Sequence, residues 1–152
     1  MDNFDKAENK GRALLESFLN QANITDWQPT TDKYDGVDGY FTHNGKKTVA
    51  EIKVRNIMYL DYPTHYLELI KYNHMIDILN EGGATVGFYC NFFGDDILYI
   101  YNILNAADCE ISWEWCKKTS AADNGETYKQ MINIPTVKAL KFKRVDGIWK
   151  KI

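Results

Sequence analysis

The sequence of 152 residues predicts an α/β fold in which a central mixed β-sheet is flanked by helices. Two segments carry apolar residues at helical spacing, and two pairs of alternating segments are each separated by a short turn signal. The elements follow the order helix, strands, helix, strands. Apolar residues make up 45% of the chain and charged residues 26%, which is typical of one globular unit, so we expect residues 1–152 to form a single domain.

Cysteine content and hydropathy exclude several classes of protein. Cys90, Cys109 and Cys116 are odd in number and lack a Cys-x-x-Cys spacing, which argues against a disulfide framework and a thiolate zinc site. The N-terminus is polar and acidic rather than a signal peptide, and no apolar run approaches the roughly 18 residues that a membrane helix needs. We therefore expect a cytoplasmic protein with no membrane partner.

The first helix is predicted over residues 4–21. Leu14, Leu15, Phe18 and Leu19 fall on one helical face, and Gly11 extends this face upstream. The segment that follows, residues 24–36, contains Pro29 and is predicted to hold one short strand or an irregular edge segment.

A second helix is predicted from Thr64 to Asn80, because Pro63 is a start signal and the Glu-Gly-Gly sequence at 81–83 is a stop signal. Residues 84–93 and 96–103 then form a hairpin across Gly94 and Asp95. The remaining segments around residues 111–118, 127–134 and 137–144 are short strands or an additional helical turn, and we expect Trp113 and Trp115 to lie in the core.

The hairpin at residues 40–54 has a register that its turn defines. Asn44-Gly45 predicts a two-residue type I′ turn, so His43 pairs with Lys46 and the same rule extends to Asp38 and Glu51. Side chains alternate between the two faces of a sheet, which places Asp38, Glu51 and Lys53 on one face. The opposite face receives an apolar set: Val37, Phe41, Ala50, Ile52 and Val54.

Two carboxylates directly opposite each other on a sheet repel and destabilise it unless a cation lies between them. Oxygen ligands with vacant water positions favour Mg²⁺ or Mn²⁺. Lys53 would lie beside this ion, where it can position water or stabilise charge on a phosphate oxygen. Two alternatives stay open: Asp38 and Glu51 on a solvated face, flanking Lys53 as an ion pair, or Asp35 in place of Asp38 if Gly36 or Gly39 forms a bulge.

Asp38 followed by Glu51-Ile52-Lys53 on a hairpin between two helices resembles the PD-(D/E)XK nuclease superfamily. The resemblance covers roughly residues 4–101 and implies a restriction-endonuclease-like core of order αβββαβ, here with extra C-terminal strands. Val37 stands where the family pattern has proline. Lys71-Tyr72 after two apolar residues is similar to phage and mobile-element nucleases of this class.

The resemblance implies roles for particular residues. Asp38, Glu51 and the backbone carbonyl of Ile52 would bind the metal, and Lys53 would be the catalytic lysine. Glu16 occupies the place of a further metal ligand that many members have on the first helix, with Glu8 as a substitute, although Glu16 can equally be an ordinary solvent-facing acid. Lys71 would approach the scissile phosphate, unless it is a solvated surface lysine.

The charge distribution bears on the partner. Residues 1–116 carry 9 basic and 18 acidic residues, whereas residues 117–152 carry 9 and 3, so the second part is basic although the whole chain has a net charge of −3. We expect Arg55, Lys71, Lys141 and Lys143 to bind the phosphates of DNA, and the tyrosines at 59, 62 and 66 to stack on bases.

The predicted function is therefore a metal-dependent endonuclease that hydrolyses DNA phosphodiester bonds. A homodimer would allow such an enzyme to cut both strands. The alternative is a catalytically inactive nuclease-like module that binds nucleic acid or a protein. Retention of the two acids together with the lysine favours the enzyme, because an inactive module has no physical need for a pair of carboxylates that repel each other.

Overall fold

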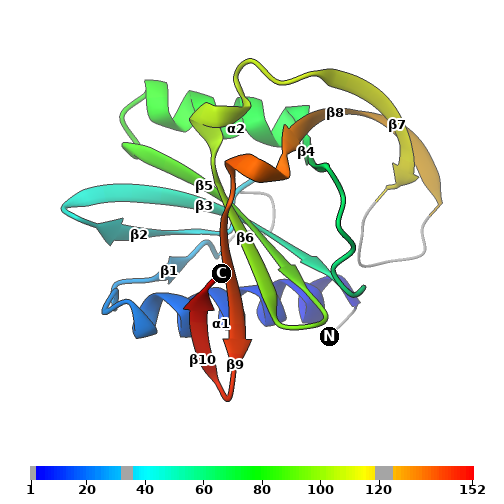
Figure 1. Ribbon diagram of the computed structural model, residues 1–152. Coiled ribbons are helices and arrows are strands. Elements are labelled where there is room, and N and C mark those ends of the chain that lie inside the picture. The colour runs from blue at the N-terminus through cyan, green and yellow to red at the C-terminus, as the bar shows by residue number, and fades with distance from the viewer. Residues whose placement is uncertain (1–2, 32–35, 119–124) are drawn as a thin grey trace.

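The computed structural model describes residues 3–31, 36–118 and 125–152, and it layers one helix, a large sheet, and a second helix with a small sheet (Figure 1). The helix α1 (Asn3–Gln21) lies below the large sheet, and α2 (Leu69–Asn80) lies above it. None of the helices in the described ranges is long and apolar enough to cross a membrane.

The large sheet has seven strands in the order β1-β2-β3-β5-β6-β9-β10. Their bounds are β1 (Gln28–Pro29), β2 (Gly39–His43), β3 (Lys46–Arg55), β5 (Val86–Phe93), β6 (Ile97–Asn102), β9 (Leu140–Val145) and β10 (Ile148–Lys151). β3 and β5 run parallel, while the other neighbouring strands are antiparallel. A parallel pair needs a crossover connection, and α2 lies within it, so the predicted order αβββαβ is confirmed, with β6, β9 and β10 as the extra strands.

The small sheet has the order β4-β8-β7. Its strands are β4 (Thr64–Glu68), β7 (Ile111–Lys117) and β8 (Glu126–Pro135). Short 3₁₀ helices at Ile103–Ala106 and Thr136–Lys138 connect the strands of the two sheets.

The second helix begins later than the sequence predicted. Residues 64–68 form the strand β4 and not the first turns of α2, and they pair with β8. His65 and Leu67 are buried whereas Tyr66 between them is exposed, which is the period of two of a strand. Pro63 was therefore misleading as a helix start, because the cross-strand partner of this segment lies some 65 residues further along the chain.

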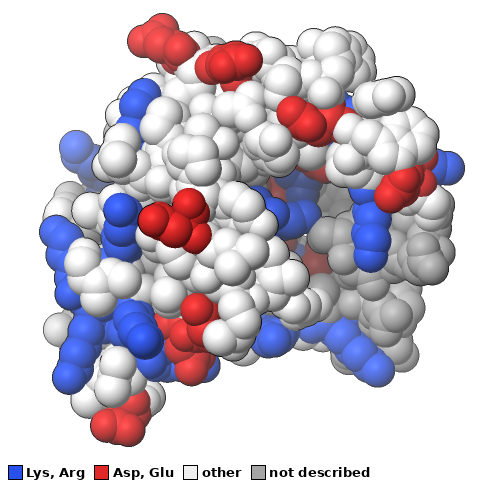
Figure 2. Space-filling model, turned by 45° about the vertical axis from the view of Figure 1, so that its right-hand side comes forward, with Lys and Arg blue, Asp and Glu red and all other residues white. Residues whose placement is uncertain are grey.

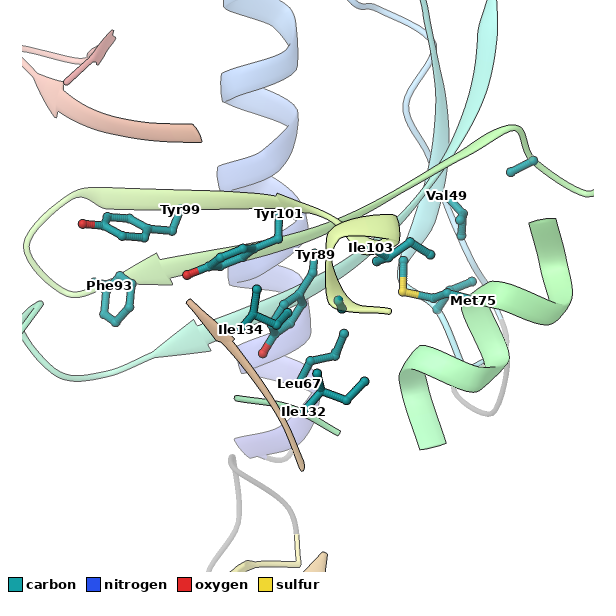
Figure 3. Close-up of a cluster of buried hydrophobic side chains, with 13 residues drawn as sticks. Val49, Leu67, Met75, Tyr89, Phe93, Tyr99, Tyr101, Ile103, Ile132 and Ile134 are labelled. Atoms are coloured by element: carbon teal, nitrogen blue, oxygen red, sulfur yellow. The ribbon is translucent and has the colours of Figure 1, made fainter. Parts of the chain in front are cut away.

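The core has two parts, one on each side of the large sheet. On the α1 side lie Leu15, Leu19, Phe41, Ala50, Cys90, Phe92, Leu98, Ile100 and Trp149. On the α2 side, tyrosines enter the cluster beside aliphatic residues of α2 and the small sheet (Figure 3). Tyr89, Tyr99 and Tyr101 are each less than 5% exposed.

The segments around α1 and β10 are joined by a reciprocal pair of hydrogen bonds. The Gln21 side-chain amide donates to the Trp149 carbonyl at 2.6 Å, and the Trp149 backbone N–H donates to Gln21 Oε1 at 2.7 Å. The Trp149 indole N–H also donates to Ser17 Oγ at 3.3 Å. The last strand is thereby fixed to the first helix.

Trp113 and Trp115 were predicted to lie in the core, but both are exposed. They are 65% and 55% exposed, and they alternate along β7 with partly buried residues, so they lie on the more exposed face of this strand. Trp115 packs edge-on against Tyr128 with ring centroids 4.6 Å apart. Aromatic content alone therefore gave the wrong environment for this hairpin.

Candidate active site at the end of the first hairpin

The first hairpin has the predicted register. His43 pairs with Lys46, and every pair down to Gly39 and Ala50 follows the same rule. The ladder ends there, one residue before the predicted Asp38–Glu51 pair, while β3 continues to Arg55. The chemistry-bearing part of β3 therefore lies beyond the end of its partner β2.

Asp38 lies at this end of the hairpin and forms hydrogen bonds with two residues of β3. Its backbone N–H donates to the Ala50 carbonyl at 3.0 Å, so Asp38 and Gly39 both face Ala50 as in a β-bulge. Its Oδ2 accepts the backbone N–H of Ile52 at 2.7 Å. The C=O of a strand residue points to the same edge as its N–H, so the Ile52 carbonyl also faces the unpaired edge beside Asp38.

The bulge moves Val37 to the other side of the sheet. The predicted apolar face contained Val37 with Phe41, Ala50 and Ile52, but Val37 packs in the cluster on the α2 side and the others lie on the α1 side. One extra residue in a strand reverses the faces of all residues before it, and the turn sequence carries no signal for this.

Helix α1 supports Asp38 from below. Arg12 donates to Thr30 Oγ1 at 3.3 Å, and the Thr30 hydroxyl donates to the Val37 carbonyl at 2.7 Å. The pKa of Asp38 is raised by burial, which the Ile52 N–H and the positive charges of Lys71 and Arg12 oppose. Asp38 thus lies between a cation on α1 and a cation on α2.

The structure separates the two acids of α1 that were candidates for the metal site. Glu16 is exposed, whereas the partly buried Glu8 carboxylate lies 3.9 Å from the Arg12 guanidinium. Because Arg12 acts on Asp38, Glu8 is the acid of α1 that is connected to the site.

Glu51 is the most buried acid of the site, with 4% of its surface exposed. Lys71 Nζ on α2 donates to its Oε1 at 2.7 Å. The pKa of Glu51 is raised to about 7, chiefly by burial; the charges of Asp38 and Glu68 contribute to the rise, while Lys71 opposes it. A buried carboxylate with one lysine as partner is a group that a second positive charge would stabilise.

Lys53 lies two residues further on the same face. Burial lowers its pKa to about 8, helped by the positive charges of Arg55 and Lys71 and opposed by Glu68. Its neighbour across the sheet is the fully buried Asn91, whose Oδ1 accepts a hydrogen bond from Arg55 Nε at 3.3 Å. Lys53 is therefore an amine that can lose and regain a proton near neutral pH.

Two residues of this cluster were missed by sequence reasoning. Glu68 ends β4, and its Oε1 accepts a hydrogen bond from Lys129 Nζ on β8 at 2.5 Å. Although burial raises the pKa of Glu68, the hydrogen bond from Lys129 and the charge of Lys71 lower it below its ordinary value. Glu68 lies three residues before Lys71, and this spacing within the predicted helix was the signal that could have indicated that the two are close. Lys129 left no such signal, because it is 61 residues away in the chain.

The basic residues predicted to bind DNA fall into two groups. Arg55 and Lys71 belong to the cluster around Glu51. Lys141 lies in one row across the sheet with Lys53, Asn91 and Tyr99, on the same face and about 14 Å from Lys53 at the usual spacing of strands. Lys143 is exposed two residues further along β9.

One face of the molecule is hollowed, and Lys or Arg side chains lie beside Asp or Glu side chains inside the hollow (Figure 2). Of the tyrosines predicted to stack on bases, Tyr62 and Tyr66 are 44% and 40% exposed. Tyr59 packs inward against Phe93 and Tyr99 instead. Asp35, the substitute for Asp38, lies outside the described residues.

The oxygen donors of this site suit a small divalent cation. Within residues 3–31, 36–118 and 125–152, one carboxylate oxygen of Asp38 and one of Glu51 accept no hydrogen bond, and the Ile52 carbonyl faces the same edge. In the parts of the chain that the structure describes, no three His, Cys, Asp or Glu side chains are grouped as a metal site. Mg²⁺ binds through one or two carboxylates plus water, so two acids and a carbonyl fit Mg²⁺ better than Zn²⁺ or Ca²⁺.

The fold is similar to that of Hjc, a Holliday junction resolvase from the archaeal hyperthermophile Archaeoglobus fulgidus. The two chains are 11% identical, 82% of each is covered, and the TM-score is 0.52. This likeness shows the fold, and it confirms the restriction-endonuclease-like fold expected of the PD-(D/E)XK superfamily. No family model and no curated protein matches the sequence.

Proposed function

We propose that the protein is a metal-dependent endonuclease that hydrolyses phosphodiester bonds in DNA. The observation that carries this proposal is the grouping of Asp38, Glu51 and Lys53 at the open end of the first hairpin, with Lys71 in contact with Glu51. The restriction-endonuclease-like fold supports it, since Hjc, which has a similar fold, is a Holliday junction resolvase.

The residues present have complementary roles in such a reaction. Asp38, Glu51 and the Ile52 carbonyl would hold Mg²⁺ or Mn²⁺, which when bound supplies a more acidic water and neutralises charge on the phosphate. Lys53, with a pKa of about 8, accepts a proton from the attacking water or stabilises the negative charge that develops on the phosphate oxygens. Arg55 and Lys71 hold the phosphate in place.

The basic residues of β9 would extend the contact with DNA. Lys141 shares the face and the row of Lys53, so a nucleic-acid backbone that crosses the sheet can contact both. Such phosphate contacts make affinity fall as salt rises. Loss of Lys141 and Lys143 should therefore weaken binding of all sequences alike and reduce the salt dependence.

The test is cleavage of three DNA substrates by purified protein in Mg²⁺, in Mn²⁺ and in EDTA. The substrates are supercoiled plasmid, single-stranded DNA and a four-way junction, the last because Hjc is a Holliday junction resolvase. We expect cleavage only with metal, and loss of cleavage in Glu51→Gln. The matched control is Glu81→Gln, which makes the same change at an exposed position after the last turn of α2.

Metal-independent binding without cleavage would contradict the proposal and support the inactive nucleic-acid-binding module. Absence of both binding and cleavage would leave a protein partner as the ligand. The homodimer stays a prediction, and sedimentation of the protein with and without DNA tests it. The similarity to phage and mobile-element nucleases also stays a prediction.

A further inference from the structure

We propose that Lys71 is an internal cation that holds Glu51 when no metal is bound, and that Glu68 is the second carboxylate that holds Lys71 after Lys71 leaves Glu51. This inference rests on the proposed function, because it assumes that Glu51 is a metal ligand. It assigns to Glu68 a positioning role that neither the motif nor the fold implies.

The first step of the argument is the contact between Lys71 and Glu51. Lys71 Nζ lies 2.7 Å from Glu51 Oε1, while 5% of the Glu51 side chain is exposed and 42% of the Lys71 side chain is. A buried carboxylate without a partner is strongly unfavourable, so the metal-free protein needs this lysine. An ammonium and a divalent cation compete for the same carboxylate, so Lys71 must move away from Oε1 for Glu51 to bind metal fully.

The second step is the position of Glu68. It is the last residue of β4 and stands directly before α2, three residues ahead of Lys71 in the chain. The charge of Glu68 acts on Lys71, on Glu51 and on Lys53, so it belongs to the same cluster. Lys71 is the more exposed member of its ion pair with Glu51, so its side chain has more freedom to move than the buried carboxylate.

The third step is the second partner of Glu68. Lys129 on β8 donates to Glu68 Oε1 and to the Lys118 carbonyl at 2.8 Å. These contacts fix Glu68 at the base of the β7–β8 hairpin, so it is held in place while Lys71 moves. Glu68 has two oxygens, and Lys129 occupies one of them. The other is available for Lys71.

The experiment measures Mn²⁺ affinity by calorimetry without nucleic acid. It compares wild type with Lys71→Gln, Glu68→Gln and the double variant. Lys71→Gln keeps a hydrogen-bond donor near Glu51 but removes the competing charge, so Mn²⁺ should bind about tenfold more tightly. Glu68→Gln should weaken Mn²⁺ binding about three- to tenfold, and at least half of this effect should vanish in the Lys71→Gln background.

Two controls keep the result interpretable. Lys46→Gln removes one positive charge at the exposed turn of the first hairpin and should leave Mn²⁺ affinity within twofold of wild type. Lys71→Met is the second variant if Lys71→Gln is poorly folded, and its melting temperature should fall without metal and recover with saturating Mn²⁺.

Unchanged or weaker Mn²⁺ binding by both Lys71 variants would overturn the internal-cation role. Additive effects of the two substitutions would overturn the role of Glu68 as second holder of Lys71. A wild type that binds Mn²⁺ through Glu51 but cuts no DNA would contradict the proposed function alone. DNA cleavage combined with no change of affinity in the Lys71 variants would contradict only this inference.

Discussion

The two faces of the large sheet differ in what they bury. Toward α1 the strands present apolar side chains such as Phe41, Ala50 and Phe92, which pack in one hydrophobic cluster with Leu15 and Leu19 of the helix. Toward α2 the same strands present Glu51 and Asn91, both less than 5% exposed, together with three tyrosines. Neighbouring residues of one strand, Ala50 and Glu51, thus belong to two different environments.

This difference separates stability from chemistry within a single strand. Burial of apolar side chains against α1 stabilises the sheet without needing any partner for polar groups. On the α2 side each buried charge needs a counter-charge, and Glu51 obtains one from Lys71. We expect substitutions on the first face to change mainly the free energy of unfolding, and substitutions on the second to change mainly activity.

The largest expected effect is on catalytic activity, from a substitution on the α2 side of the sheet. Lys53→Met should lower the rate of DNA cleavage about 10²- to 10⁴-fold, the usual range for loss of a proton-transferring group. It should also stabilise the protein by about 1 kcal/mol at pH 7. Burial lowers the pKa of Lys53 to about 8, so the neutral amine favours folding and this contribution is lost as pH falls through about 8. At pH 7 the amine is charged, and its burial lowers the free energy of unfolding.

Urea unfolding and single-turnover cleavage of the same preparation measure both quantities. A variant that loses activity because it unfolds more easily would contradict the separation of roles. The volume of Met is close to that of Lys, so packing changes little.

The next effect is on the α1 face. Leu15→Ala should lower the free energy of unfolding by about 2–5 kcal/mol, because Leu15 is 1% exposed and its truncation leaves a cavity between α1 and β3. Catalytic rates measured well below the melting temperature should remain within about twofold of wild type. A large loss of activity in a folded Leu15→Ala protein would mean that the two faces are coupled.

A smaller effect is expected from His65, on the α2 side. Burial, and to a lesser degree the charge of Arg55, lowers its pKa to about 4, while its Nδ1 and the Tyr101 hydroxyl are hydrogen-bonded at 2.6 Å. Its lowered pKa gives a stability contribution that is present above about 6.5 and is lost as pH falls through about 4. Wild type should therefore lose about 2 kcal/mol more than His65→Phe between pH 7 and pH 4.5 in urea unfolding. Equal losses would show that His65 titrates normally.

The smallest effect is expected at Trp113. Because this side chain is 65% exposed, Trp113→Ser should change the free energy of unfolding by less than about 0.5 kcal/mol. A loss of more than 2 kcal/mol in thermal or urea unfolding would mean that the aromatic face of the β7–β8 hairpin is covered in solution.

Local signals predicted the parts of the fold that are close in sequence. Asn44-Gly45 gave the register of the first hairpin, and the apolar spacing gave α1 and the hairpin of β5 and β6. The alternation of side chains along β3 places Glu51 and Lys53 on one face, and Lys71 reaches Glu51 from the helix that crosses over to β5.

Long-range partners account for what the sequence did not reveal. The pairing of β4 with β8 overrode the helix signal at Pro63, and the bulge at Asp38 is determined by where β2 stops against Ala50. Glu68 joins the site through Lys129 on a distant strand. None of these long-range contacts can be recognised from the periodicity of apolar residues in the segment whose structure it determines.

The reciprocal hydrogen bonds between Gln21 and Trp149 join two segments that are 128 residues apart in the chain. Helix α1 therefore stays partly uncovered until β10 has docked, because Trp149 packs against Phe18.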